Sequence, residues 1–120
     1  MSKLYKKHKI GIYGEDKAVE YIKRIGYKII QRNFRCKVGE IDIIAKDKDE
    51  LVFIEVKTRT SIKYGKPIEA VDAIKKKHMY KSIQYYLINE KIEHDFIRID
   101  AIEVYLRNGI CVINHLKQIF

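Results

Sequence analysis

The pattern of apolar and polar side chains is clearest between Gly39 and Lys57, where it predicts two strands. The run Gly39–Ala45 is rich in isoleucine, and the run Leu51–Lys57 combines β-branched and aromatic residues. A charged segment, Lys46–Glu50, separates them. Two such runs around a short turn rich in Lys and Asp are typical of a β-hairpin. We therefore expect an antiparallel pair of strands at the centre of the fold.

Carboxylates interrupt both strands of this hairpin. Because strand side chains alternate between faces, Ile41 and Ile43 share one face while Asp42 lies on the other. Glu55 and Lys57 end a face of the second strand that starts apolar. Antiparallel pairing places Asp42 and Glu55 at the same end of the hairpin, where they repel unless a proton or a cation lies between them. Charges that protect an edge strand from aggregation would give the same pattern.

The chemistry of these three side chains favours a metal site. Carboxylate oxygens suit Mg²⁺, which typically uses one or two of them and keeps several waters. Lys57 points the same way as Glu55, where it could hold a metal-bound water or a developing phosphate charge. An Asp on one strand and Glu-x-Lys on the next is the pattern of a metal-dependent phosphodiesterase.

A first helix is predicted over Gly14–Ile25, because apolar residues recur there at helical spacing and Gly26 marks an end. Glu15 falls on the apolar stripe of this helix. We interpret it as a third carboxylate that faces Asp42 and Glu55. A first-turn acid favoured by the helix dipole is the alternative explanation.

A second helix is predicted from about Asp72, a good N-cap, to Asn89. Its predicted buried face consists of Val71, Ile74, His78, Met79, Ile83, Tyr86 and Leu87. A basic triplet, Lys75–Lys77, occupies the first turns, which is the unfavourable end of the helix dipole for positive charge. Another role must therefore set those charges, and one of the three lysines is placed to point at the site.

The rest of the chain completes a sheet. Further strands are predicted at Tyr27–Arg35, Phe96–Leu106 and Ile110–Leu116, with an Asn-Gly turn between the last two. The one long loop, Thr58–Pro67, is polar, basic and aromatic. It suits a phosphate-contacting or lid role, although a plain connector would look the same. We expect an α/β fold, a mixed central β-sheet flanked by two main helices.

Composition indicates one folded domain with a basic surface. The 120 residues include 25 Lys+Arg against 16 Asp+Glu, a net charge of +9, and 47% are hydrophobic. This balance suits a polyanion, either nucleic acid or an acidic membrane surface. We divide the chain into a basic N-terminal arm, 1–10, and a single domain, 11–120. The arm would contact phosphates or be a solvated tail.

Several alternatives are excluded by what the sequence lacks. No apolar run reaches the ~20 residues of a membrane span, and no apolar region follows the basic N-terminus as in a secretory signal, so we expect a cytoplasmic protein. Cys36 and Cys111 are too few and too isolated for a zinc site or a disulfide framework. There is no Walker A loop, Gly-x-Gly-x-x-Gly or Gly-x-Ser-x-Gly motif.

Taken together, the motifs resemble the PD-(D/E)XK nuclease superfamily and, within it, the YraN-type family of small bacterial proteins, which are similar to archaeal Holliday junction resolvases. The resemblance covers nearly everything from Gly11 to Phe120. It depends on Gly14-Glu15-Asp16-x-Ala18, Arg32-Asn33-x-Arg35, Gly39-Glu40-Ile41-Asp42, Phe53-Ile54-Glu55-Val56-Lys57-x-Arg59, Tyr64-Gly65-x-Pro67-x-Glu69-Ala70-Val71 and Arg98-x-Asp100. The proline of the superfamily's name is replaced, since Ile41 precedes Asp42.

The resemblance implies a restriction-endonuclease-like fold in the order αβββαββ, with Mg²⁺ or Mn²⁺ as the cofactor. It implies that Glu15, Asp42 and Glu55 bind the metal, with a further contact at Val56, and that Lys57 assists the attack of water. The residues expected to contact nucleic acid are Arg59, Lys63, Lys75, Lys76 and Lys77.

The leading function is therefore metal-dependent endonucleolytic hydrolysis of nucleic acid, with DNA favoured and a structure-specific substrate compatible. One alternative is a non-catalytic nucleic-acid-binding module that keeps the fold. Another is a protein-interaction subunit with a basic docking face. Intact Asp42, Glu55 and Lys57 favour catalysis, because a binding module has no need to crowd carboxylates beside phosphates. A homodimer is compatible with the sequence, and no membrane partner is expected.

Overall fold

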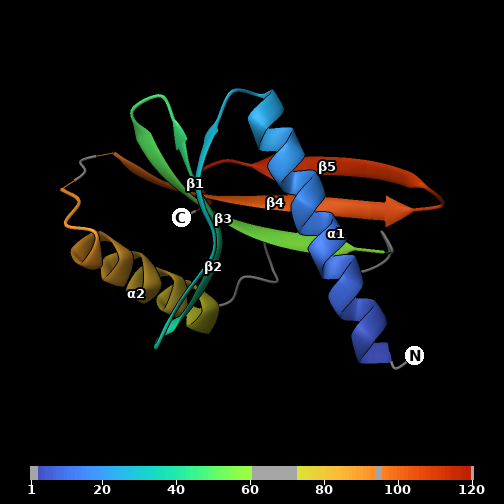
Figure 1. The fold of residues 1–120 in the computed structure, drawn as a ribbon, viewed down its shortest axis with the longest axis horizontal. Coiled ribbons are helices and arrows are strands. Elements are labelled where there is room, and N and C mark those ends of the chain that lie inside the picture. Colours follow the sequence, from blue (N-terminus) through green and yellow to red (C-terminus); the bar gives the residue numbers. More distant parts are fainter. Residues whose placement is uncertain (1–2, 61–72, 94–95, 120) are drawn as a thin grey trace.

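The computed structural model describes residues 3–60, 73–93 and 96–119, which form a five-stranded sheet with a helix on each face (Figure 1). The elements are α1 (Lys3–Arg24), β1 (Lys28–Cys36), β2 (Gly39–Asp47), β3 (Glu50–Arg59), α2 (Ala73–Asn89), β4 (Ile97–Arg107) and β5 (Ile110–Leu116). The strands lie side by side in chain order. Strands β3 and β4 are parallel, whereas the other neighbours are antiparallel. The expected mixed sheet and element order are confirmed.

The face of the sheet toward α1 holds one apolar core. Ala18, Val19 and Ile22, which form one stripe of the second half of α1, are buried there. The sheet residues buried with them are Ile43, Ala45, Val52, Ile54, Ile102 and Val104. Figure 1 shows α1 running across the strands, with its N-terminal turns extending past the sheet. Only the second half of this helix therefore anchors it.

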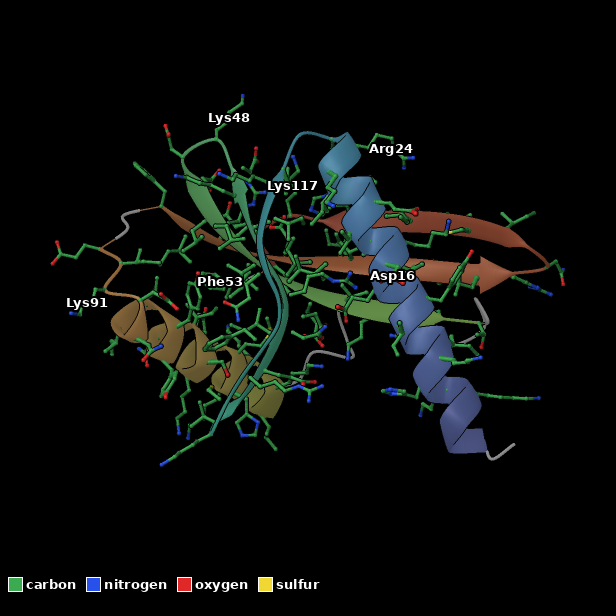
Figure 2. The ribbon with its side chains drawn as sticks, in the orientation of Figure 1. Asp16, Arg24, Lys48, Phe53, Lys91 and Lys117 are labelled. Carbon is green, nitrogen blue, oxygen red and sulfur yellow. The ribbon has the colours of Figure 1, made fainter. Side chains whose placement is uncertain are left out.

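The opposite face packs against α2. Met79, Ile83 and Tyr86 form the buried stripe of that helix, and Phe53, labelled in Figure 2, lies between the sheet and α2. The prediction that Ile74 and His78 belong to the stripe is wrong. Both are exposed, because they lie five and one residues before Met79 and so point away from it. Val71 and Asp72 lie outside the described residues.

The first helix begins at Lys3 rather than at Gly14, so most of the segment expected as an N-terminal arm is helical. Residues 6–13 of α1 are all exposed. No apolar stripe marks this stretch, because it packs against no core. The periodicity of the sequence consequently missed the first half of the helix.

Strict alternation of side chains in β2 would place Ile41 and Ile43 on one face, and this prediction is wrong. Ile43 faces α1 as part of one core, but Ile41 faces α2 as part of the other. The change occurs opposite Asn33 of the neighbouring strand, which adopts a left-handed conformation with φ of 53°. Asn33 stands between Arg32, which pairs with Ile43, and Phe34, which pairs with Ile41.

A close approach fixes where α1 crosses β3. A methyl group at Gly14 would lie 2.9 Å from Cβ of Thr58, so no larger residue fits without displacing the helix. The following residue, Glu15, is thereby held near the end of β3. No helix in the described part of the chain is long and apolar enough to cross a membrane.

Candidate active site

Asp42 lies where β2 separates from β3. The two strands pair continuously from the turn up to Ile43 and Ile54. One step further, the backbone N–H of Val56 donates to Oδ2 of Asp42 across 2.8 Å. A side chain thus bridges the strands at the point where their regular pairing ends. We call this point the β2–β3 fork, defined by Asp42, Glu55 and Val56.

The surroundings of Asp42 disfavour its ionised form. Burial raises the pKa of this carboxyl most, the negative charge of Glu55 adds to the effect, and the value reaches about 7 although the N–H of Val56 lowers it. Two carboxylates that interact in this way must share a proton or attract a cation. The predicted proximity of Asp42 and Glu55 is confirmed.

Glu55 is buried on the α2 side of β3, where two lysines contact it. Nζ of Lys57 lies 3.5 Å from Oε1 of Glu55, and Nζ of Lys75 from α2 contacts the same oxygen. Burial and the neighbouring Lys75 lower the pKa of Lys57. Burial also lowers the pKa of Lys75, but Glu55 outweighs it and the net change is upward. Of the basic triplet, Lys75 is the residue that points at the fork.

Glu15 reaches the same region from α1. Nη2 of Arg32 lies 3.2 Å from Oε1 of Glu15 and 2.8 Å from Oδ1 of Asp16. Glu15 and Asp42 line one cleft, and the charge of Glu15 contributes to the raised pKa of Asp42. The structure therefore brings Glu15 toward Asp42 while pairing its carboxylate with a guanidinium.

The donors at the fork suit a hard divalent cation. Asp42 and Glu55 offer carboxylate oxygens, and Mg²⁺ commonly binds through one or two of them. Burial raises the pKa of Asp42 most, and the charge of Glu55, which adds to that effect, is what such an ion would offset. Within the described ranges, no group of three or more Asp, Glu, His or Cys side chains could hold a metal. A carboxylate pair fits better than the expected triad, and contacts from Glu15 and Val56 stay predictions.

The predicted nucleic-acid contacts are distributed around this site. Arg59 pairs in register with Tyr105 of β4, and its Nε is buried without a hydrogen-bond partner among the described residues. Lys76 and Lys77 are exposed on α2. Lys63 lies outside the described residues, as does most of the loop Thr58–Pro67. Lys75 contacts Glu55 and is partly exposed.

Sequence reasoning missed Glu103, a fully buried carboxylate that is the register partner of Lys57. It accepts hydrogen bonds from Oη of Tyr105 at 2.5 Å and from Nδ2 of Asn114 at 2.7 Å. An acid directly between the apolar residues Ile102 and Val104 was the available indication. The pairing of Arg32 with Glu15 was also missed, because it joins elements that are distant in the sequence.

A second buried carboxylate lies on the other side of the sheet. Asp100 accepts from Nε of Arg98 at 2.9 Å and from the backbone N–H of Gln118 at 3.0 Å, and Nε2 of His115 lies 2.7 Å away. Burial would raise the pKa of Asp100, but the hydrogen bonds from His115 and Arg98 outweigh it and lower the value. Both oxygens are satisfied, so this centre is structural.

A mixed five-stranded sheet between two helices, with Asp and Glu-x-Lys on adjacent strands, defines a protein of the restriction-endonuclease-like fold class. The chain belongs to the uncharacterised protein family UPF0102, whose profile matches residues 14–104. The resemblance to the YraN-type family of the PD-(D/E)XK superfamily is thereby confirmed.

Relatives of this family are close in sequence. A UPF0102 protein of Caldicellulosiruptor saccharolyticus is 45% identical over 116 residues, which cover 95% of this chain and 98% of the relative. A UPF0102 protein of Clostridium botulinum strain Hall is 57% identical over 98 residues, or 81% and 80% of the two chains. These names establish the family and state no activity.

Proposed function

We propose that this protein is a Mg²⁺- or Mn²⁺-dependent endonuclease that hydrolyses phosphodiester bonds of nucleic acid, with DNA as the first candidate. The observation that carries the proposal is the β2–β3 fork, where Asp42 and Glu55 crowd their negative charges beside Lys57. The net charge of +9 on the chain supports a polyanionic substrate. A cytoplasmic location belongs to the same proposal.

Each residue of the fork has a distinct task in this mechanism. Asp42 and Glu55 would hold the metal, and the N–H of Val56 keeps the Asp42 carboxylate oriented. The bound ion supplies Lewis-acid polarisation of the phosphate and a more acidic water. Lys57 lies on the same face as Glu55, so its ammonium group can stabilise the charge that develops on the phosphate oxygens.

The proposal is tested with linear, flapped and four-way DNA, and with RNA, in the presence of Mg²⁺ or Mn²⁺. We expect the wild type to cleave and Asp42→Asn, which preserves side-chain shape, to lose both cleavage and metal binding measured by calorimetry. Lys57→Ala should reduce the single-turnover rate by ~10²–10³ while DNA affinity changes little. Lys81→Ala, an exposed lysine of α2 outside the predicted contacts, is the matched control. Unchanged metal affinity in Asp42→Asn and Glu55→Gln would refute the site.

One observation favours a second candidate, a nucleic-acid-binding module without turnover. Lys75 already places a positive charge on Glu55, so the fork is partly neutralised by the protein's own side chains. A wild type that binds DNA tightly in chelator and cuts nothing in either metal would establish this function instead.

A further inference from the structure

The exposed first half of α1 borders a large cleft. Residues 6–13 are exposed, whereas the buried Ala18, Val19 and Ile22 all lie further along the helix. Helices in proteins gain most of their stability from packing an apolar face. This half of α1 therefore contributes little to the core. It forms instead one side of a cleft of about 1160 Å³, whose other side comes from β1, β2 and the end of β3.

The charges in the cleft are unevenly compensated. Its basic lining residues are Lys6, Lys7, Arg32 and Arg35, and its acidic ones are Glu15, Glu40 and Asp42. Arg32 pairs with Glu15, and Nε of Arg35 lies 3.4 Å from a carboxylate oxygen of Glu40. Lys6 and Lys7 form no ion pair with any residue that the structure describes. Their charges remain available to an anion that passes Asp42.

Apolar side chains line the same cleft beside these lysines. Ile10 is 36% exposed and Ile12 is 49% exposed, and both come from the same turns of α1 as the basic residues. The lysines of the cleft can bind phosphates. Its apolar side chains, in contrast, can contact bases only where the faces of those bases are exposed. A duplex hides the faces of its bases, whereas a single strand presents them to a binding groove. The lining therefore matches an unpaired strand better than a duplex.

We propose that this cleft binds an unpaired nucleic-acid strand, with Lys6 and Lys7 on its phosphates and Ile12 against a base. The strand then runs past Asp42 at the β2–β3 fork. This inference deepens the proposed function, because it names single-stranded or frayed nucleic acid as the substrate class. It assigns to the first half of α1 a role in positioning the substrate.

The experiment measures binding without metal, by fluorescence anisotropy in chelator, with a single-stranded oligonucleotide and a duplex of equal length. Lys6→Gln/Lys7→Gln removes two charges from the cleft. Lys23→Gln/Arg24→Gln removes two charges from the last turn of the same helix, where Figure 2 labels Arg24. Circular dichroism verifies that both variants keep their helix content.

We expect the wild type to prefer the single strand. Two lost phosphate contacts should reduce the slope of log affinity against log salt by about 1.4 in the cleft variant, while the control keeps the wild-type slope. Lys6→Arg/Lys7→Arg should restore the slope. Ile12→Ser should weaken single-strand binding and leave duplex binding unchanged, whereas Ile88→Ser, at a 78% exposed position of α2, should change neither.

Equal slopes in the cleft variant and its control would overturn the inference, as would a duplex bound as tightly as the single strand. Because binding is measured in chelator, its result does not depend on whether the protein cleaves nucleic acid with metal. A wild type that binds the strand through Lys6 and Lys7 but cleaves nothing would refute the endonuclease and support the cleft.

Discussion

Asp42 and Asp100 come from strands of one sheet, and the groups around them shift their pKa values in opposite directions. Asp100 is fully buried and receives hydrogen bonds on both oxygens, so its pKa is lowered. Asp42 receives one backbone hydrogen bond, and burial together with the charge of Glu55 raises its pKa to about 7. Asp100 is hydrogen-bonded on both oxygens within the protein, whereas Asp42 shares the nearby lysines with Glu55.

This difference separates a structural charge from a functional one. Arg98 bonds Asp100, and its Nη1 lies 3.1 Å from both Asp47 and Glu50, so that one guanidinium ties β4 to the β2–β3 turn. A network of this kind stabilises the fold, and both oxygens of Asp100 already accept hydrogen bonds within it. At the fork, an unsatisfied acid beside a lysine retains the capacity to bind a ligand.

The largest difference in unfolding free energy is expected between two variants, Asp100→Asn and Asp42→Asn. Asp100→Asn leaves Arg98 buried with less compensating charge, which typically costs about 3–5 kcal/mol of unfolding free energy. Asp42→Asn removes a repelling charge and should leave stability unchanged or raise it. Urea unfolding at neutral pH in chelator measures both. Equal destabilisation by the two variants would contradict the distinction between the centres.

The pH dependence of stability should be a smaller consequence of the same contrast. The folded pKa of Asp100 lies below its unfolded value of 3.8, so its contribution is complete above that value and is lost as the pH falls through the folded pKa. Unfolding free energy should therefore decline in acid. In the Asp100→Asn variant, unfolding free energy should decline less steeply in acid than in the wild type. An equally steep decline in both proteins would assign it to other carboxyls.

The smallest effect is expected from Lys75→Met, which removes one of the two cations on Glu55. Stability in chelator should fall by no more than about 1 kcal/mol, because Lys75 is partly exposed. The rise in melting temperature on adding Mn²⁺ should exceed that of the wild type, since the ion then replaces the missing charge. Lys76→Met is the control. A weaker response to Mn²⁺ would mean that Lys75 supports the metal site.

Much of the architecture was predictable from local patterns. Alternating residues predicted β2 and β3, Asn108-Gly109 predicted the turn before β5, and periodicity predicted α2 and the second half of α1. The carboxylate pair also followed, because the partner of Asp42 lies across a short turn. These features depend on residues that are close in the sequence.

The features that could not be predicted from the sequence depend on packing between elements that are distant along the chain. Neither the left-handed conformation of Asn33 nor the placement of Ile41 on the α2 side is evident from composition. The pairing of Glu15 with Arg32 joins α1 to β1, and the contact of Lys75 with Glu55 joins α2 to β3. Each requires knowing where a helix lies on the sheet.

The parallel junction of β3 and β4 has a consequence for the order of folding. Strands β1 to β3 and the hairpin β4–β5 each need only short loops to close, whereas β3 and β4 meet across the whole α2 crossover. Closing the longer loop costs more chain entropy, so non-local pairing of this kind slows folding. Asp42 and Glu55 both belong to the local N-terminal unit. The carboxylates can therefore be brought together before the two halves of the sheet join, while Lys75 reaches them only once α2 has docked.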